Sequence, residues 1–525
     1  MSHSVSVSAS ASVKQPAWES WCILLSMCVA VFTIGLMSTG VIDAMVKMRD
    51  QLNLSPTTLQ WLMNAYLLTA ASFVIISGRI SEIYGRRNLF VAGVIIFVVG
   101  LVIAACASDG AWVIVGRAVQ GGGAAILAPG TMAILKLKLP PARQAFAVTT
   151  WSASAGLGFS FGPIIGGALT DGLSWRYLFW LAALLLVVSL ILLFIGRAKN
   201  KPAQGLQHID WLGTVLLILF TLPFFLGLVQ GNAWGWSNPW VWGLLLFGVI
   251  FFFILLVVEL AKKAPLVMFE LFSNHQFALG AIGMIFNGFT LLTILYFTSL
   301  YLQVPFLQNF SPVMAGVALL PFSIGFFVAS ISASFVTNKF GFRLPLLTSG
   351  LLQFGGFLWL CFITSQTTYL FLWAPYFLVG LGCGFNMATF PVLAMMSVDD
   401  EHANKASGFV NMTNYLGATL SPAIGTIFFV GLSTSIFYDL LKHIPVSDAQ
   451  AHRIASALFG HPDQMKHLFQ ALVPHTRAEV LFAMKHSAIV GNMSVMIISA
   501  AVGLIMAFLP LLVLSVVPAK SNADH

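Results

Sequence analysis

Arg117 is the residue whose chemistry is most unusual for its place in the chain. It stands inside a long apolar run, and Gln120 follows one helical turn later. A charge inside a bilayer is costly, and such residues usually face a cavity or a partner and mark ion or substrate pathways. Arg117 is therefore a candidate cavity charge. The alternative is a structural arginine near the outer end of its span, which snorkels or pairs.

Other polar residues inside the apolar runs are few. The amides near the middle of these runs are Asn64, Gln120, Asn287, Gln353, Asn386, Asn411 and Asn414. We expect most of them to form hydrogen bonds between helices rather than to contact a ligand. The sequence shows no nucleophile with a base, no paired acids, no metal-ligand cluster and no phosphate-binding GxxxxGK[ST] loop. An enzyme, a metal site, a cofactor and ATP-driven transport are therefore not expected.

The elements that hold these residues are membrane helices. The chain has 525 residues, of which 58% are hydrophobic and 8% charged, against about 25% charged in soluble domains. Fourteen apolar runs approach or exceed the roughly 20 residues that a spanning helix needs. They are 19–44, 57–77, 89–107, 112–135, 146–169, 177–196, 210–230, 239–261, 277–301, 312–336, 345–365, 369–396, 407–433 and 487–515. The predicted fold class is an all-α polytopic membrane protein.

Charge in the short loops predicts the orientation. Lys and Arg gather in the loops that follow even-numbered spans, such as those containing Arg86 and Lys138, and are rare in the opposite short loops. By the positive-inside rule both termini are cytoplasmic. The net charge of +8 therefore indicates no nucleic-acid partner, and the five cysteines lie in apolar runs without metal or disulfide spacing. The long opposite loop, 434–486, is expected to form an amphipathic helical hairpin, because its six histidines are too widely spaced for a metal site.

An internal repeat predicts two related halves. Gly158, Gly162, Pro163 and Gly166 lie in one span, and Gly417, Ser421, Pro422 and Gly425 repeat the pattern far downstream. Two loops also match, with Gly85 and Arg87 corresponding to Gly341 and Arg343. The predicted organisation is a disordered tail over 1–16, six spans within 17–200, two inserted spans within 201–263, six spans within 264–515 and a tail over 516–525.

These motifs resemble the major facilitator superfamily and, within it, the fourteen-helix drug:proton antiporter branch. The loop from Gly78 to Arg87 resembles the family's cytoplasmic loop motif, with Glu82 where Asp is usual. The segment from Arg117 to Gly123 resembles its fourth-helix motif, and the segment from Gly158 to Gly167 its antiporter motif. The segments 209–213, 265–272, 301–303 and 311–316 resemble that branch.

The resemblance implies a bacterial inner-membrane efflux transporter that exports drugs or secreted metabolites by alternating access with proton coupling. It implies a cytoplasmic latch between the halves at Gly78, Glu82, Gly85, Arg86 and Arg87. It also implies close contacts between the moving halves at Gly158, Gly162, Pro163, Gly166, Gly417, Ser421 and Pro422. Gram-negative members work with a periplasmic adaptor protein and an outer-membrane channel. The expected substrate and proton pathway contains Arg117, Gln120, Asp43, Met37 and Asn64.

One departure from the family pattern leaves alternatives open. The family usually carries an acidic residue in the first span, where this chain has Met37, and Asp43 follows six residues later, about 9 Å along a helix. Asp43 can carry proton coupling from this shallower position. An exporter of an anionic metabolite such as a siderophore, with atypical or no proton coupling, is the second interpretation. A non-transporting membrane sensor is the third.

Overall fold

A computed structural model describes residues 17–138, 141–197, 210–262, 269–304, 307–364, 366–396, 398, 403–444 and 474–515. These residues form helices and contain no strand. The helices are α1 (Ala17–Leu52), α2 (Pro56–Tyr84), α3 (Arg86–Ala105), α4 (Gly110–Lys138), α5 (Pro141–Gly172), α6 (Arg176–Ile195), α7 (Trp211–Trp234), α8 (Pro239–Ala261), η1 (Phe269–Ser273), α9 (His275–Gln303), α10 (Pro312–Ala318), α11 (Leu320–Phe340), α12 (Arg343–Leu360), α13 (Tyr369–Met395), α14 (Ala403–Leu441) and α17 (Pro474–Ser515).

The helices confirm the predicted all-α membrane fold. Thirteen of those described are long and apolar enough to cross a membrane. The shorter α12 is not among them; it packs between α13 and α17 and lies where the span 345–365 was predicted. The predicted span 312–336 is divided into α10 and α11. Several helices also run beyond their predicted ends: α1 reaches Leu52, α2 reaches Tyr84, α14 reaches Leu441, and α17 begins at Pro474.

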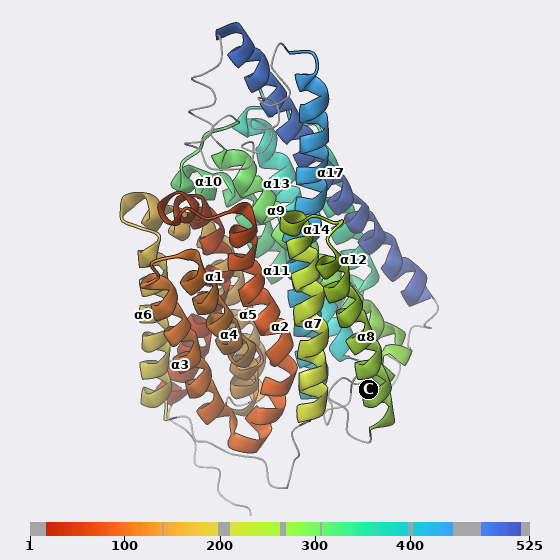
Figure 1. Ribbon diagram of the computed structural model, residues 1–525. Helices are drawn as coiled ribbons and strands as arrows, with labels where there is room; N and C mark the ends of the chain where they lie inside the picture. The colour runs from red at the N-terminus through yellow and green to blue at the C-terminus, as the bar shows by residue number, and fades with distance from the viewer. Residues whose placement is uncertain are drawn as a thin grey trace, which may run out of the picture.

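The helices form two bundles side by side (Figure 1). In the first bundle α1 packs along α5, and α4 packs between α2 and α3. In the second bundle α9 packs along α14, and α13 packs between α11 and α12. The contacts of α1 with α5 and of α4 with α2 and α3 are therefore repeated in the second bundle by α9 with α14 and by α13 with α11 and α12. We call α1–α6 the first half and α9–α17 the second half.

The halves meet along two seams. One seam joins α2 to α14, and the other joins α5 to α10 and α11. On the second seam Ser160 Oγ donates to the Ser323 carbonyl at 3.1 Å, and Ser323 Oγ donates to the Ser160 carbonyl at 2.8 Å. Helix α7 lies outside the bundles, against α2 and α14, and α8 packs on α7.

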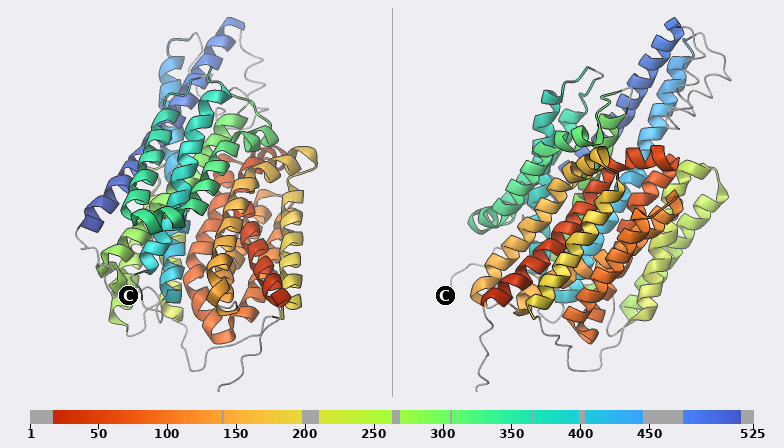
Figure 2. Two further views of the ribbon diagram at one scale, coloured as in Figure 1. Left: turned by 180° about the vertical axis from the view of Figure 1, so that it is seen from behind. Right: turned by 90° about the vertical axis from the view of Figure 1, so that its left-hand side faces the viewer.

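Figures 1 and 2 show the two ends of the molecule. Helix α1 begins at the lower end in Figure 1, where α7 also begins and α8 ends, and the upper parts of α14 and α17 project beyond the other helices. We call these the lower and upper ends. Most of the segment 434–486, where an amphipathic helical hairpin was predicted, lies outside the described residues, which show α14 reaching Leu441 and α17 beginning at Pro474.

Candidate functional site between the two halves

Arg117 is fully buried, and its guanidinium is bound by neutral groups of the first half. Its Nε donates to the Leu62 carbonyl of α2 at 3.0 Å, and one Nη donates to the Met37 carbonyl of α1 at 3.4 Å. The same Nη donates to Gln120 Oε1 at 2.8 Å, and the guanidinium lies 4.2 Å from the Tyr66 ring centroid. Its other Nη has no hydrogen-bond partner among the described residues. The prediction that Gln120 accompanies Arg117 agrees with this geometry.

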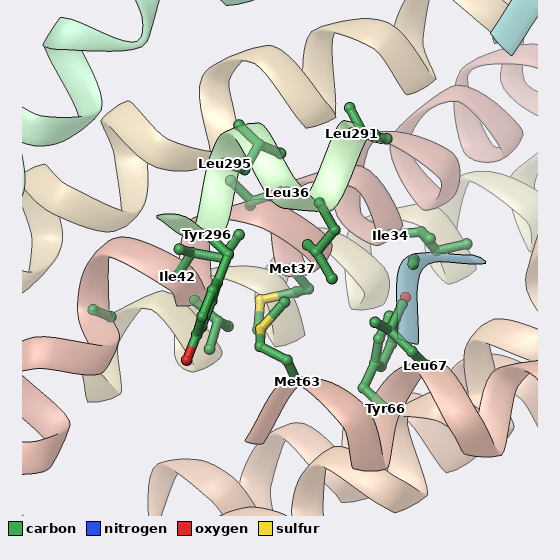
Figure 3. Packing of buried hydrophobic residues seen from close by; sticks show 14 of the residues in the cluster. Ile34, Leu36, Met37, Ile42, Met63, Tyr66, Leu67, Leu291, Leu295 and Tyr296 are labelled. Carbon is green, nitrogen blue, oxygen red and sulfur yellow. The ribbon is translucent and has the colours of Figure 1, made fainter. Parts of the chain in front are cut away.

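Met37 places a thioether in the buried apolar cluster, and its backbone carbonyl is one of the groups that bind Arg117. In Figure 3 the Met37 and Met63 side chains point toward each other, and Tyr296 and Leu295 of α9 lie beside them. All of these side chains are buried in one apolar cluster to which both halves contribute. The interior between α1, α2 and α9 is therefore lined by apolar side chains, and Arg117 lies at its edge.

Asp43 is a fully buried carboxylate of the same helix, and its hydrogen-bond partners belong to the other half. Its Oδ1 accepts hydrogen bonds from Ser299 Oγ at 2.6 Å and from Gln303 Nε2 at 3.2 Å. Gln303 Nε2 also donates to Ser299 Oγ at 2.6 Å. Asp43 Oδ2 and Gln303 Oε1 have no hydrogen-bond partner among the described residues. The sequence singled out Asp43 but not Ser299, although Gln303 stands one turn after Ser299 on the same face of α9.

The predicted amides differ in their partners. Asn411 donates to the Ser407 carbonyl within its own helix, against the expectation, and Asn287 donates to Met387 Sδ of α13 at 3.7 Å. Gln120 donates to the Gly100 carbonyl at 3.1 Å, Asn414 to the Met284 carbonyl at 3.2 Å, and Asn386 accepts from Ser349 at 2.5 Å. These three join different helices, as predicted. Asn64 and Gln353 are fully buried, and none of their amide atoms has a partner among the described residues. Asn64 thus remains a candidate pathway residue.

The glycine motifs pack helices within each half, so the expectation that they form the close contacts between the moving halves is wrong for the glycines. A Cβ on Gly158, Gly162 or Gly166 would collide with the backbone or side chains of α1. Gly417 likewise lies against the Ile285 backbone of α9. The physical reason is that close backbone approach requires glycine at the tight crossings of α1 with α5 and of α9 with α14.

Other residues of the same motifs have separate contacts. Ser421 shares a 2.8 Å hydrogen bond with Thr293 of α9, and Pro422 lies inside α14. The Pro163 carbonyl faces Gly316 of α10 and does lie on the seam between the halves. The seam therefore uses the face of α5 that does not hold α1.

The loop motif from Gly78 to Arg87 is divided by a sharp turn. Helix α2 ends at Tyr84, and Gly85 has φ +87°, a conformation that favours glycine. Glu82 and Arg86 therefore do not share one continuous helix, and the Glu82 side chain lies outside the described part. Arg87 stacks over Phe194 near the end of α6, 5.0 Å from the ring centroid.

The matching arginine of the second half has a parallel contact. Arg343 donates to the Leu514 carbonyl near the end of α17. Both arginines thus join the start of the third helix of their half to the end of its sixth helix. For Arg87 this contact lies within the first half, so it gives no support for a latch between the halves.

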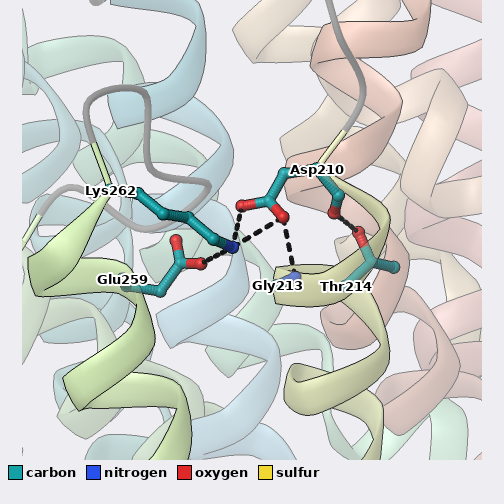
Figure 4. Close-up of polar contacts among 5 residues, drawn as sticks. All are labelled: Asp210, Gly213, Thr214, Glu259 and Lys262. Atoms are coloured by element: carbon teal, nitrogen blue, oxygen red, sulfur yellow. Dashed lines mark hydrogen bonds and ion pairs between the residues drawn. The ribbon is translucent and has the colours of Figure 1, made fainter.

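The inserted pair of helices is held at its lower end by three charges (Figure 4). Asp210 caps α7 by accepting from the Gly213 amide at 2.8 Å, and Lys262 Nζ lies 2.7 Å from Asp210 and 2.8 Å from Glu259. Burial alone would raise the pKa of Asp210, but the hydrogen bonds from Lys262 and Gly213 outweigh it and lower that pKa. Burial likewise opposes the charge of Lys262, yet the two carboxylates raise its pKa.

Two six-helix bundles that share an interior with buried charges define a transporter-type membrane fold. Residues 27–422 match the Major Facilitator Superfamily, and the chain belongs to that family. Its members are transporters, not enzymes. No group of three or more His, Cys, Asp or Glu residues that could hold a metal ion occurs in the described part of the chain.

Curated relatives cover most of this chain. Multidrug resistance protein 3 of Bacillus subtilis is 27% identical over 73% of this chain and 73% of its own length. The tetracenomycin C resistance and export protein of Streptomyces glaucescens is 28% identical over 80% and 78%, respectively. A bacterial homologue of the human lysosomal transporter Spinster, solved in an inward-facing and unoccupied conformation, superposes with TM-score 0.58 at 14% identity, covering 95% of this chain and 98% of that chain. This last likeness supports the fold alone.

Proposed function

We propose that this protein exports amphiphilic small molecules, drugs or secreted metabolites, across a bacterial cytoplasmic membrane by proton-coupled alternating access. The observation that carries the proposal is the interior shared by the halves, where an apolar cluster around Met37 and Met63 lies beside Arg117 and Asp43. An apolar interior with a few placed polar groups suits amphiphilic ligands. The printed names of the relatives, which concern drug resistance and antibiotic export, support the same class.

The pathway is proposed to contain Met37, Asn64, Arg117 and Gln120, with Asp43 toward the upper end. Rearrangement along the α2–α14 and α5–α11 seams would open this interior to one side of the membrane at a time. The tight α1–α5 and α9–α14 crossings keep each half rigid during that motion. Both termini are proposed to lie in the cytoplasm, which places the upper end outside.

A second candidate is the export of an anionic metabolite such as a siderophore, with atypical or no proton coupling. The specific observation is that Arg117 is bound only by neutral groups and keeps one Nη without a partner in the described part of the chain. An arginine fork presents paired donors that match a carboxylate. A substrate carboxylate would therefore find a cation that is not already paired.

The projecting parts of α14 and α17 support a proposed contact with a periplasmic adaptor and an outer-membrane channel. Helix α14 has 39 residues and α17 has 42, whereas a bilayer core needs roughly 20. Site-specific photo-crosslinking from exposed Phe482 in intact cells tests this contact. A crosslink confined to lipid or to this chain itself would count against the adaptor.

The export proposal is tested by comparing intact cells with cells that lack the protein. Both strains are assayed for retained native metabolites and for a set of cationic dyes. Retention of cationic dyes by the deletion strain supports drug export, and retention of an anionic metabolite alone supports the second candidate. Equal contents for every compound, with the protein expressed in the parent strain, would contradict export.

A further inference from the structure

We infer that Asp43, Ser299 and Gln303 form a proton-binding site that is complete only while the upper ends of the two halves touch. We call these three residues the cross-half site. The inference rests on the proposed export and deepens it, because it assigns the coupling ion and the residues that hold it. Asp43 comes from α1 of the first half, and both of its partners come from α9 of the second half.

The hydrogen bonds of the cross-half site leave one position for a proton. Ser299 and Gln303 both donate to Asp43 Oδ1, so this oxygen is satisfied. Asp43 Oδ2 is shielded from solvent and receives no hydrogen bond from the described residues. An ionised carboxylate that is buried with an unpaired oxygen is unfavourable, because burial removes the hydration of its charge. A proton on Oδ2 removes the charge, and it turns that oxygen into a donor.

A second acceptor stands in the same site. Gln303 Oε1 is also buried and has no partner among the described residues, while its amide nitrogen is held by Asp43 and Ser299. The site thus presents two acceptor oxygens that receive no hydrogen bond from the described residues. A bound cation would satisfy both oxygens. A single proton is the smallest cation that balances the charge of one carboxylate.

Charged groups around the site do not neutralise Asp43. Lys47 lies one turn further along α1 and is exposed, and Asp43 forms no ion pair with a described residue. Of the helices packed on α1, α4 contributes Arg117, which is held by carbonyls, and α6 contributes Arg176, which donates to the Ala107 carbonyl. Helix α5 contributes Asp171, which accepts from the Val313 amide. The tyrosines on the helices packed on α1 are Tyr66 and Tyr84 of α2, Tyr177 of α6, and Tyr296 and Tyr301 of α9.

The position of the site links proton binding to conformation. Separation of α1 from α9 would remove both donors from Asp43 and expose its carboxylate to water, which stabilises the ionised form. Contact between the halves favours the proton-bound form, because the dry interior does not stabilise an unpaired charge. Each state of the proton therefore favours one arrangement of the halves, which is the linkage that coupled transport requires.

Carbodiimide labelling of the purified full-length protein tests the site directly, because dicyclohexylcarbodiimide reacts with protonated carboxyl groups in apolar surroundings. Mass spectrometry of the Asp43 peptide would follow labelling across pH, with and without Na⁺. We expect labelling to fall about tenfold per pH unit above its midpoint. Ser299→Ala and Gln303→Ala should move that midpoint. Thr290→Ala on the same helix, whose hydroxyl donates to the Phe286 carbonyl, should not.

Each outcome decides the inference. Labelling of Asp43 that follows pH, ignores Na⁺ and responds to the two α9 variants supports it. Protection by Na⁺ at constant pH would show a metal-cation site and overturn the proton assignment, and labelling insensitive to pH or to both variants would overturn the cross-half site. Cells that export nothing while Asp43 still labels as expected would contradict the proposed function alone. Export without such labelling would contradict this inference alone.

Discussion

Arg117 and Asp43 are both fully buried charged residues, and they are held in opposite ways. Arg117 is bound by the Leu62 and Met37 carbonyls and by Gln120, all within its own half. Asp43 is bound by side chains of the other half and keeps one oxygen without a partner among the described residues. A rigid movement of the halves would carry the partners of Arg117 along with it, but would remove those of Asp43.

The difference separates two roles for a buried charge. A charge whose partners move with it keeps its environment in every state, and it can serve as a fixed attraction for a substrate. A charge whose partners lie across the seam changes its environment with each rearrangement, and it can report or drive that change. Variants that disturb the two residues should therefore fail in different ways.

The largest effect is expected from Arg117→Ala. The substitution leaves the Leu62 and Met37 carbonyls without their hydrogen-bond donor, which costs about 1–3 kcal/mol for each buried group left unsatisfied. It also leaves a large cavity where the buried arginine side chain was. We expect loss of export and a clear fall in folded protein. Membrane content by immunoblot and efflux from loaded cells measure both. Arg117→Lys keeps the charge but not the planar fork, and full export by that variant would show that the fork is not needed.

Gly162→Leu should have the second-largest effect, because it disrupts the tight crossing of α1 with α5. Any Cβ at Gly162 would collide with Thr39 and approach the Gly40 backbone. We therefore expect poor folding rather than a folded protein without flux. Gly130→Leu in α4 is the matched control, since a Cβ there meets no atom within 4 Å. Detergent-extracted yield and thermal unfolding compare the two, and equal stability would refute the tight crossing.

Asp43→Asn should leave folding intact but remove coupling. The amide fills the same volume and still accepts from Ser299, so membrane content should match the parent. In proteoliposomes, substrate movement down its own gradient should persist, while an imposed pH gradient should no longer drive accumulation. If the pH gradient still drives substrate accumulation by this variant as it does by the parent, Asp43 is not the coupling group. Thr290→Ala again serves as the control on α9.

Met37→Asp sharpens the comparison by placing a carboxylate where the family usually has one. The Met37 carbonyl already contacts Arg117, so the new side chain would stand beside that guanidinium within the same half. We expect anionic substrates to be exported several-fold more slowly, because a carboxylate would neutralise the free cation. Met37→Leu controls for volume. Unchanged anion export in both variants would remove Arg117 from substrate recognition.

The smallest effect is expected at the charges that join α7 to α8. Asp210 has a lowered pKa, so its ionised form stabilises the fold above its ordinary pKa and this contribution is lost as the pH falls through the lowered value. Asp210→Ala removes both the cap and the ion pair, whereas Asp210→Asn keeps a capping oxygen. We expect the alanine variant to be less stable by about 1 kcal/mol. Thermal unfolding at neutral and acidic pH measures the difference, and identical curves would contradict it.

Much of the fold could be predicted because it depends on composition and local pattern. Apolar runs longer than a bilayer core must be helices, since only helices and closed barrels satisfy the backbone in lipid. The glycine and proline repeat predicted two related halves, which the corresponding contacts of α1 with α5 and of α9 with α14 agree with. The ends of the helices were less predictable, because α14 and α17 continue as helices beyond the apolar runs predicted for them.

The site was only partly predictable. Arg117 and Asp43 stand out in any apolar sequence, and Gln120 follows from helical spacing. Which helix each glycine face meets could not be read from spacing, so Gly162 was assigned to the moving seam when it packs on Thr39 and Gly40 of its own half. The charge pair at Lys262 was missed for the same reason, because its partner Asp210 lies 52 residues earlier in the chain.

The sequence by itself determined the environment of Arg117 and Asp43. Hydropathy decides which segments enter the membrane, and a charge within those segments is energetically costly. Only the tertiary structure decided their partners. Ser299 stands 256 residues from Asp43, and no local rule connects them. Helical periodicity tells which side chains share a face. The packing of the two halves decides what that face meets, and therefore which buried charge is fixed within one half and which lies across the seam.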